Sequence, residues 1–144
     1  MMATQCYCSL TVGLRTVLLT DPYLAVRLPY SQDNSLNRFW VEGLVPERAP
    51  APYLTMITLG RPNIQHDSDG MRSAENIRIR VYDTREALDI ASRIVDVLRD
   101  SCICVGDDYP TNNCCFKLVS MQETVIGLAT LAEIVFSTIW TKPH

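Results

Sequence analysis

Polar and apolar residues alternate over positions 75–82 of the chain. The apolar members of this segment, Ile77, Ile79 and Val81, take every second position. Because successive side chains of a strand point to opposite faces, the pattern predicts a strand with one buried face. The other face carries Arg78 and Arg80. We expect these arginines either to meet an acidic partner or to lie on a face that solvent or another subunit covers.

The apolar period lengthens after Asp83. Asp83 and Glu86 have the spacing of a capping box, which marks the start of a helix. Apolar residues then recur at intervals of three and four, namely Ala87, Ile90, Ala91, Ile94, Val95 and Leu98. This stripe predicts a long amphipathic helix over about 84–100. Since such a stripe must be buried, we expect the helix to pack against the sheet.

The N-terminal segment predicts two further helices. One covers about 6–19, where a single face holds Leu10, Leu14, Val17 and Leu18. The other covers about 22–28, where Asp21 can cap the helix and Pro22 suits its first turn. Both helices are expected to pack through their apolar side chains.

Five more segments predict strands, mainly through their β-branched and aromatic residues. They cover about 38–44, 53–59, 102–105, 115–122 and 131–140. In the fourth, one face is expected to hold Phe116 and Leu118, and the other Lys117, Val119 and Met121. No repeat and no second domain are visible, so we interpret residues 1–144 as one domain, with 1–5 and 141–144 expected to be flexible.

Two polar segments are candidates for contacts with other molecules. Gly60-Arg61-Pro62 should end a strand, so residues 61–73 are interpreted as a long hairpin loop, and long loops in small domains are often functional. Residues 106–113 form a second predicted loop. The Asp67-Ser68-Asp69-Gly70 stretch resembles the start of a calcium loop but lacks its remaining ligands, which favours a plain turn. The candidate contact residues are Arg61, Asp67, Asp69, Arg72, Asp107 and Asp108, together with Arg78 and Arg80 on the strand.

Composition narrows the class of protein. Hydrophobic residues make up 47% of the 144 positions and charged residues 20%, as in a folded domain. The net charge of -3 argues against a dedicated nucleic-acid binder, which is usually basic. Apolar runs fall short of the roughly 20 residues that a membrane helix needs. Arg15 interrupts the first apolar stretch, so we expect no signal peptide and folding in a reducing cytosol.

Six cysteines are present, and three interpretations of them stay open. We expect buried thiols, because free cysteine is often buried and no export signal is seen. A disulfide framework and a metal site are the alternatives, although no C-x-x-C motif occurs. A metal- or redox-responsive binding module is therefore the competing hypothesis from another functional class. We expect neither a metal nor another cofactor.

Catalytic motifs are lacking in the sequence. No nucleophile elbow, phosphate-binding loop, dinucleotide fingerprint or zinc-protease motif occurs. The two histidines, His66 and His144, lie in a polar segment and at the terminus, and Asp107-Asp108 lies in a segment expected to be solvated. We therefore predict that the chain is not an enzyme.

Three segments, taken in order, resemble one protein family. They are Thr20-Asp21-Pro22-Tyr23-Leu24, then Val41-Glu42-Gly43-Leu44-Val45-Pro46 with Ala51-Pro52-Tyr53-Leu54, and finally Ile77-Arg78-Ile79-Arg80-Val81-Tyr82-Asp83 with Arg85-Glu86-Ala87. Their order and spacing are similar to those of the tail-completion, or tail-terminator, proteins of long-tailed bacteriophages. The likeness covers about residues 6–140, whereas the polar segment 31–37 and the cysteine-rich strands depart from it.

The resemblance implies a fold and a role. The fold is α+β, with a mostly antiparallel sheet packed against the helices. Six copies are expected to form a homohexameric ring at the head-proximal end of the viral tail, which ends tube polymerisation and mediates head–tail joining. The implied partners are the tail tube protein and the head–tail connector or neck protein, while DNA passes through the lumen without specific binding. The implied location is the virion, with assembly in the host cytoplasm and no membrane contact. Another neck or connector adaptor is the related alternative. The family supplies no catalytic residues.

Overall fold

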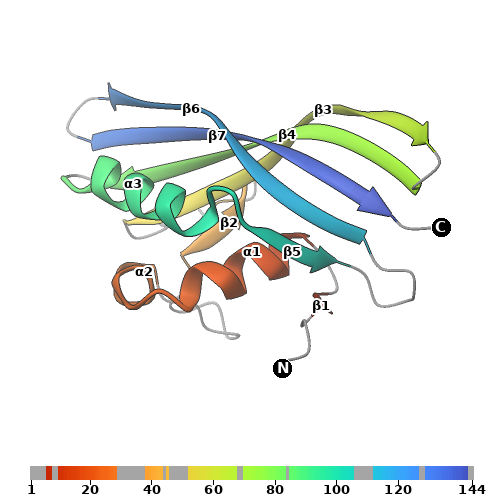
Figure 1. Ribbon diagram of the computed structural model, residues 1–144. Helices are drawn as coiled ribbons and strands as arrows, with labels where there is room; N and C mark the ends of the chain where they lie inside the picture. The colour runs from red at the N-terminus through yellow and green to blue at the C-terminus, as the bar shows by residue number, and fades with distance from the viewer. Residues whose placement is uncertain are drawn as a thin grey trace.

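A single sheet covered on one face by helices organises the chain (Figure 1). The computed structural model describes residues 6–7, 10–28, 38–43, 45, 52–67, 70–83, 85–105, 112–126 and 129–142. The elements are β1 (Cys6–Tyr7), α1 (Leu10–Leu19), α2 (Pro22–Arg27), β2 (Phe39–Val41), β3 (Tyr53–Asp67), β4 (Gly70–Asp83), α3 (Ala87–Leu98), β5 (Cys102–Val105), β6 (Asn112–Ile126) and β7 (Ala129–Lys142).

The seven strands follow the order β1-β5-β6-β7-β4-β3-β2 across the sheet. Four long strands, β6, β7, β4 and β3, form its centre and pair antiparallel. Strand β5 extends the antiparallel order, whereas β1 and β2 join the two edges in parallel. The expected α+β fold with a mostly antiparallel sheet is therefore confirmed.

The core lies between the helices and one face of the long strands. All six predicted stripe residues of α3 are buried. On the sheet, the alternating positions Ile77, Ile79 and Val81 are buried, as the period of two predicts. The neighbouring β7 contributes Ala132, Ile134 and Phe136 to the same face, and the ring of Phe136 meets that of Phe116 edge-on. Helix α1 closes the core with Leu14 and Leu18.

The predicted start of the long helix is wrong by about three residues. Strand β4 continues through Asp83, which pairs with Thr130 of β7, so the backbone of Asp83 belongs to the ladder. Helix α3 starts at Ala87, and its N-cap Glu86 makes no side-chain capping bond. Asp83 still acts locally, because its carboxylate accepts a hydrogen bond from the Glu86 N–H at 3.0 Å.

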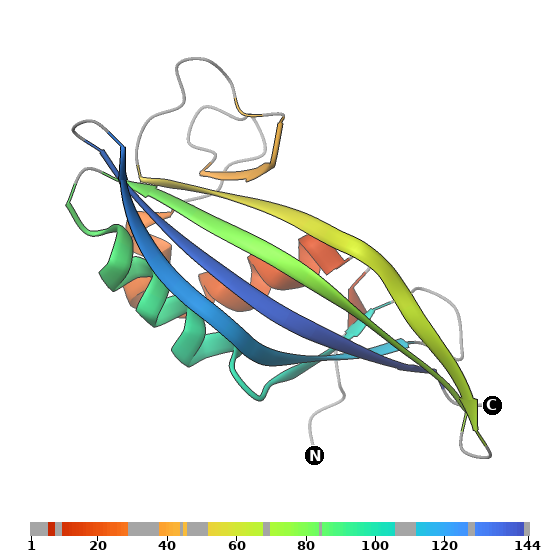
Figure 2. The same ribbon diagram turned by 90° about the horizontal axis from the view of Figure 1, so that it is seen from above.

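The predicted loop over 61–73 is also wrong. Strands β3 and β4 stay paired as far as Asp67 and Gly70, so most of that segment belongs to a long β-hairpin, and its β4 side also pairs with β7 (Figure 2). The Gly60-Arg61-Pro62 stretch coincides with a shift of register between Leu59 and Asn63. A bulge of this kind accommodates a proline, which has no N–H to donate to the ladder, and the strand continues beyond it.

A second register shift separates Leu118 from Ser120 in β6. The extra residue exchanges the two faces beyond it, so Met121 lies opposite the buried Ile134 and shares its face. The predicted placement of Met121 on the face opposite Phe116 is therefore wrong. Strands β6 and β7 are also longer than predicted, and β7 includes residues 141–142, which were expected to be flexible.

Candidate interaction surface

The outer face of the sheet carries a row of paired charges. Arg78 and Arg80 project from β4, on the side opposite the buried alternating residues. Glu42, in the turn after β2, binds Arg78 at 2.5 Å and Arg80 at 3.1 Å. Arg80 also binds Glu133 of β7 at 3.1 Å, the residue directly opposite it in the ladder. All four side chains are only 22–26% exposed.

These ion pairs change the interpretation of the two arginines. Both are half-buried and their charge is matched within the chain, so neither presents an isolated cation. Glu42 and Glu133 were not among the candidate site residues. The sequence holds one signal for Glu133, which lies between the apolar Ala132 and Ile134 in the last predicted strand, but none for a turn residue such as Glu42. A contact of Arg78 or Arg80 with a partner stays a prediction.

The other candidate contact residues are placed only in part. Arg61 and Asp67 belong to β3 and Arg72 belongs to β4, where Arg72 pairs with Gln65 and with Thr141. The positions of their side chains lie outside the described part of the chain. Asp69, Asp107 and Asp108 lie outside it altogether. The structure therefore brings Arg61, Asp67 and Arg72 onto one strand pair and says nothing of contacts among them.

Two long stretches of backbone at the sheet edges have no strand beside them in the part of the chain that the structure describes. Strand β2 covers β3 only at Leu54–Met56. Strand β5 covers β6 only over residues 112–115. Figure 2 shows the two strands at opposite sides of the four-stranded centre. Residues 57–67 of β3 and 117–126 of β6 are named here the β3 edge and the β6 edge.

Apolar side chains accompany the β6 edge. Val119, at the bulge, is 56% exposed, and Val125 is 66% exposed. Met121 lies between them and is 39% exposed. Leu88 of α3 is 40% exposed as well. Single exposed apolar residues are ordinary, but three along one open strand edge are a feature of surfaces that bind other proteins.

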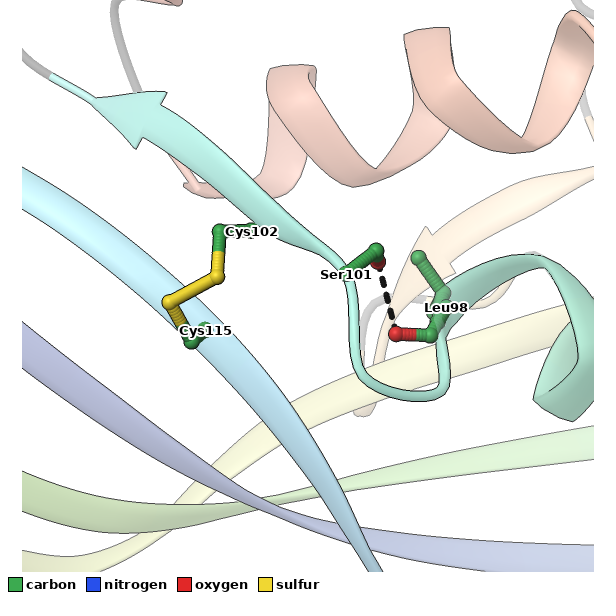
Figure 3. The surroundings of a disulfide bond; sticks show 4 residues. All are labelled: Leu98, Ser101, Cys102 and Cys115. Atoms are coloured by element: carbon green, nitrogen blue, oxygen red, sulfur yellow. Dashed lines mark hydrogen bonds between the residues drawn. A yellow bond between two sulfur atoms is a disulfide. The ribbon is translucent and has the colours of Figure 1, made fainter.

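A disulfide joins β5 to β6 below this edge. Cys102 and Cys115 lie directly opposite each other in the ladder and are bonded (Figure 3). Cys104 is disulfide-bonded too, whereas Cys114 is a buried thiol. The expectation of thiols is therefore wrong for Cys102, Cys104 and Cys115. For Cys102 and Cys115, the pairing of β5 with β6 brings the two sulfurs together. The turn into β5 is fixed by Ser101, whose hydroxyl donates to the Leu98 carbonyl at 2.6 Å.

A shallow depression of about 380 Å³ lies beside the start of α3. Its lining consists of Val26, Arg27, Arg38, Pro52, Asp83, Arg85 and Glu86. Arg27 binds Glu86 at 3.2 Å and covers the ring of Tyr23, so part of the charge in this depression is matched. The lining holds no serine, cysteine or histidine that could act as a nucleophile or base. The absence of enzymatic activity stays a prediction.

The described residues bear on metal binding and on membranes. No group of three or more histidine, cysteine, aspartate or glutamate residues there is arranged to hold a metal ion. No helix in that part of the chain is both long enough and apolar enough to cross a bilayer. The disulfides of Cys102, Cys104 and Cys115 leave these three sulfurs unavailable as thiolate ligands while the bonds are intact.

Comparisons with known proteins give a likeness to solved structures. No family model matches the sequence, and no curated protein matches it either. Among solved structures, the fold is similar to that of a chain in the virion of a native gene transfer agent particle. The TM-score is 0.60 at 15% sequence identity, and the likeness covers 92% of this chain and 95% of the other. At that identity, the comparison shows a shared fold.

Proposed function

We propose that this chain is a structural protein of a phage-like virion. The observation that carries the proposal is the fold shared, over nearly the full length of both chains, with a protein chain of a gene transfer agent virion. More finely, we propose that the chain forms the ring at the head-proximal end of the tail, ends tube polymerisation and joins the tail to the head. The order of the tail-terminator-like sequence segments supports this finer role.

Two features of the molecule suit a ring subunit. A ring needs two different surfaces on each copy that bind each other, and the β3 edge and the β6 edge offer two different surfaces on opposite sides of the four-stranded centre. The outer sheet face is neutralised internally by Glu42 and Glu133. Together with the net charge of -3, the internal pairing of these two arginines disfavours tight binding to DNA as it passes.

Antibody labelling of particles tests the proposal. Particles from cells that carry this gene would be purified and labelled with gold-conjugated antibody against the chain. Gold at the head–tail junction is expected. Gold on the capsid or at the distal tail tip would overturn the finer role, and unlabelled particles would overturn the virion assignment. Gold at the head–tail junction, together with a tail tube whose end this chain does not cap, would favour a neck adaptor instead.

A tube-growth assay tests termination by itself. Purified tail tube protein from the same particles would be polymerised with and without this chain, and tube lengths would be measured by electron microscopy. A terminator should stop elongation when present at a few copies per tube end. Unchanged tube lengths at a large excess of the chain would exclude termination.

A further inference from the structure

We propose that copies of this chain join head to tail by strand pairing, with the β3 edge of one copy bound to the β6 edge of the next. The occupant of each edge is thus a second copy of the same chain. This inference rests on the ring that the proposed function requires, and it names the surfaces that build it. Five properties of the described residues carry it.

First, the β3 edge presents backbone groups in a known direction. The Leu54 N–H donates to the Arg38 carbonyl at 2.8 Å, and the Met56 carbonyl accepts from the Glu42 N–H at 3.1 Å. Alternate residues of a strand point their backbone groups to the same neighbour. Thr58, the next residue in this series, therefore turns its N–H and C=O to the same side, beyond the end of β2.

Second, the β6 edge is long, and no strand lies beside it in the part of the chain that the structure describes. Phe116 still bonds on that side, since its N–H donates to the Ser101 carbonyl at 2.9 Å and its carbonyl accepts from the Asp100 N–H at 3.0 Å. The ten residues that follow contain no proline or glycine, and only Lys117 and Glu123 are charged. Open edges are normally blunted by such residues, because an unprotected edge pairs with any strand that reaches it.

Third, the strand directions suit the proposed pairing. Three antiparallel steps separate β6 from β3, through β7 and β4, so β6 and β3 of one copy run in opposite directions. A second copy in the same orientation therefore presents its β3 antiparallel to β6. The antiparallel order of the sheet would continue from copy to copy, in the more stable form of strand pairing.

Fourth, the two edges are offset along the strands. Followed across the ladder, the part of β3 that β2 covers lies opposite Met121 and Glu123 of β6. The part of β6 that β5 covers lies opposite Asn63 of β3. The open parts thus lie toward opposite ends of the sheet. Adjacent copies must shift along the strand direction to bring them together. A closed sheet requires such a stagger together with strand tilt, so the offset is compatible with a closed ring.

Fifth, pairing would cover the apolar side chains of the β6 edge. Val119 and Val125 are more than half exposed in the single chain. A strand laid against β6 would remove part of this surface from water, which stabilises the contact. A contact through β6 alone, between two copies related by a twofold axis, would leave the β3 edge open.

Lysine and proline variants test the pairing. Val125→Lys places a charge on the β6 edge, and Thr58→Pro removes an N–H that faces outward from β3. Val26→Lys is the matched control, because Val26 is a 78% exposed valine on α2, away from both edges. Val119→Lys serves in place of Val125→Lys if that variant does not fold, as judged by circular dichroism. Native mass is measured by light scattering coupled to size exclusion.

Head-to-tail pairing predicts a specific set of masses. The wild type and Val26→Lys should form assemblies of several times 16.2 kDa. Val125→Lys and Thr58→Pro should each be monomers alone. An equimolar mixture of the two should contain a dimer, because it holds one intact β3 edge and one intact β6 edge that match.

Other results overturn the pairing without deciding the proposed function. A wild type that stays monomeric at every concentration, or edge variants that assemble like the wild type, would exclude it. Dimers of Thr58→Pro alone would show that β6 pairs with β6 instead. In each case, the antibody labelling still decides whether the chain belongs to the virion. Conversely, the predicted masses together with gold at the distal tail tip would support the strand pairing and refute the role at the head-proximal end of the tail.

Discussion

Arg93 of α3 binds the carboxylate of Asp21, 72 residues earlier in the chain, through two of its nitrogens. Its Nη2 donates to Oδ1 at 2.6 Å, and its Nε lies 3.0 Å from both oxygens. The same carboxylate caps α2 by accepting from the Leu24 N–H at 3.2 Å. One side chain therefore both starts α2 and holds it to α3. The hydrogen bond from Arg93 lowers the pKa of Asp21 below its ordinary value.

Replacing Arg93 with glutamine should destabilise the protein in a pH-dependent way. A carboxylate whose pKa is lowered by folding stabilises the folded state above its unfolded pKa of about 3.9. That stabilisation is lost as the pH falls through the lower, folded value. The wild type should therefore have the higher urea midpoint at pH 7, and its advantage over Arg93→Gln should shrink below about pH 3.9. An advantage that does not change with pH would contradict this account.

Glutamine at position 42 should weaken the outer sheet face more than glutamine at position 133. Glu42 pairs with two arginines, whereas Glu133 pairs with one. We expect Glu42→Gln to lower the free energy of unfolding by about 1–2 kcal/mol, because it leaves two half-buried arginines with weaker partners. Glu123→Gln, at an exposed position, is the control and should change it by less than about 0.5 kcal/mol. Equal effects at positions 42 and 133 would show that the bridging role is unimportant.

Removing the disulfide between β5 and β6 should cost stability without changing the fold. The bond closes a loop with a sequence separation of 13. Under oxidising conditions, the double variant Cys102→Ser/Cys115→Ser should unfold with a free energy lower by about 3 kcal/mol, mainly through the freer unfolded chain. Denaturant titration of both proteins measures the difference. Under reducing conditions the two should converge, and a persistent gap there would point to a packing defect.

A cavity at Phe136 should cause a larger loss. This side chain is completely buried on β7, and its ring lies 6.0 Å from that of Phe116 in an edge-on arrangement. Phe136→Ala should lower the free energy of unfolding by about 3–5 kcal/mol, through lost burial and an unfilled cavity. Leu88→Ala provides a comparison at a 40% exposed site, where we expect less than about 1 kcal/mol. Thermal unfolding of both variants measures the contrast.

The regular parts of the fold followed from local pattern. The alternation around Ile79 and the stripe around Ile94 each have a period that only one element satisfies, and both residues are buried as predicted. The predictions that were wrong concern segments whose pairing partners lie far away in the sequence. The segment around Arg72 looked like a loop, yet β7 offers it a ladder partner at Thr141. Asp83 looked like a helix cap, yet Thr130 holds it in the sheet.

The candidate surface was less predictable than the fold. The charge of Arg78 was visible in the sequence, but its partner Glu42 lies 36 residues away in a turn with no periodic signal. The β6 edge was hidden for a different reason. The bulge at Val119 breaks the alternation that would identify the faces, and no local pattern reveals whether a strand has a neighbour. Edges are properties of sheet order, which depends on the whole chain.

The order of the strands also sets the timing of folding. Central strand β4 has β3, its neighbour in sequence, on one side, but its other partner is β7, the last strand described. During synthesis, β3 and β4 can pair early, while the second side of β4 must wait until β7, about 60 residues later, has left the ribosome. Contacts of such long sequence separation are entropically expensive and slow to form. Until β7 is made, the nascent chain therefore exposes the unpaired edge of β4, in addition to the β3 edge and the β6 edge.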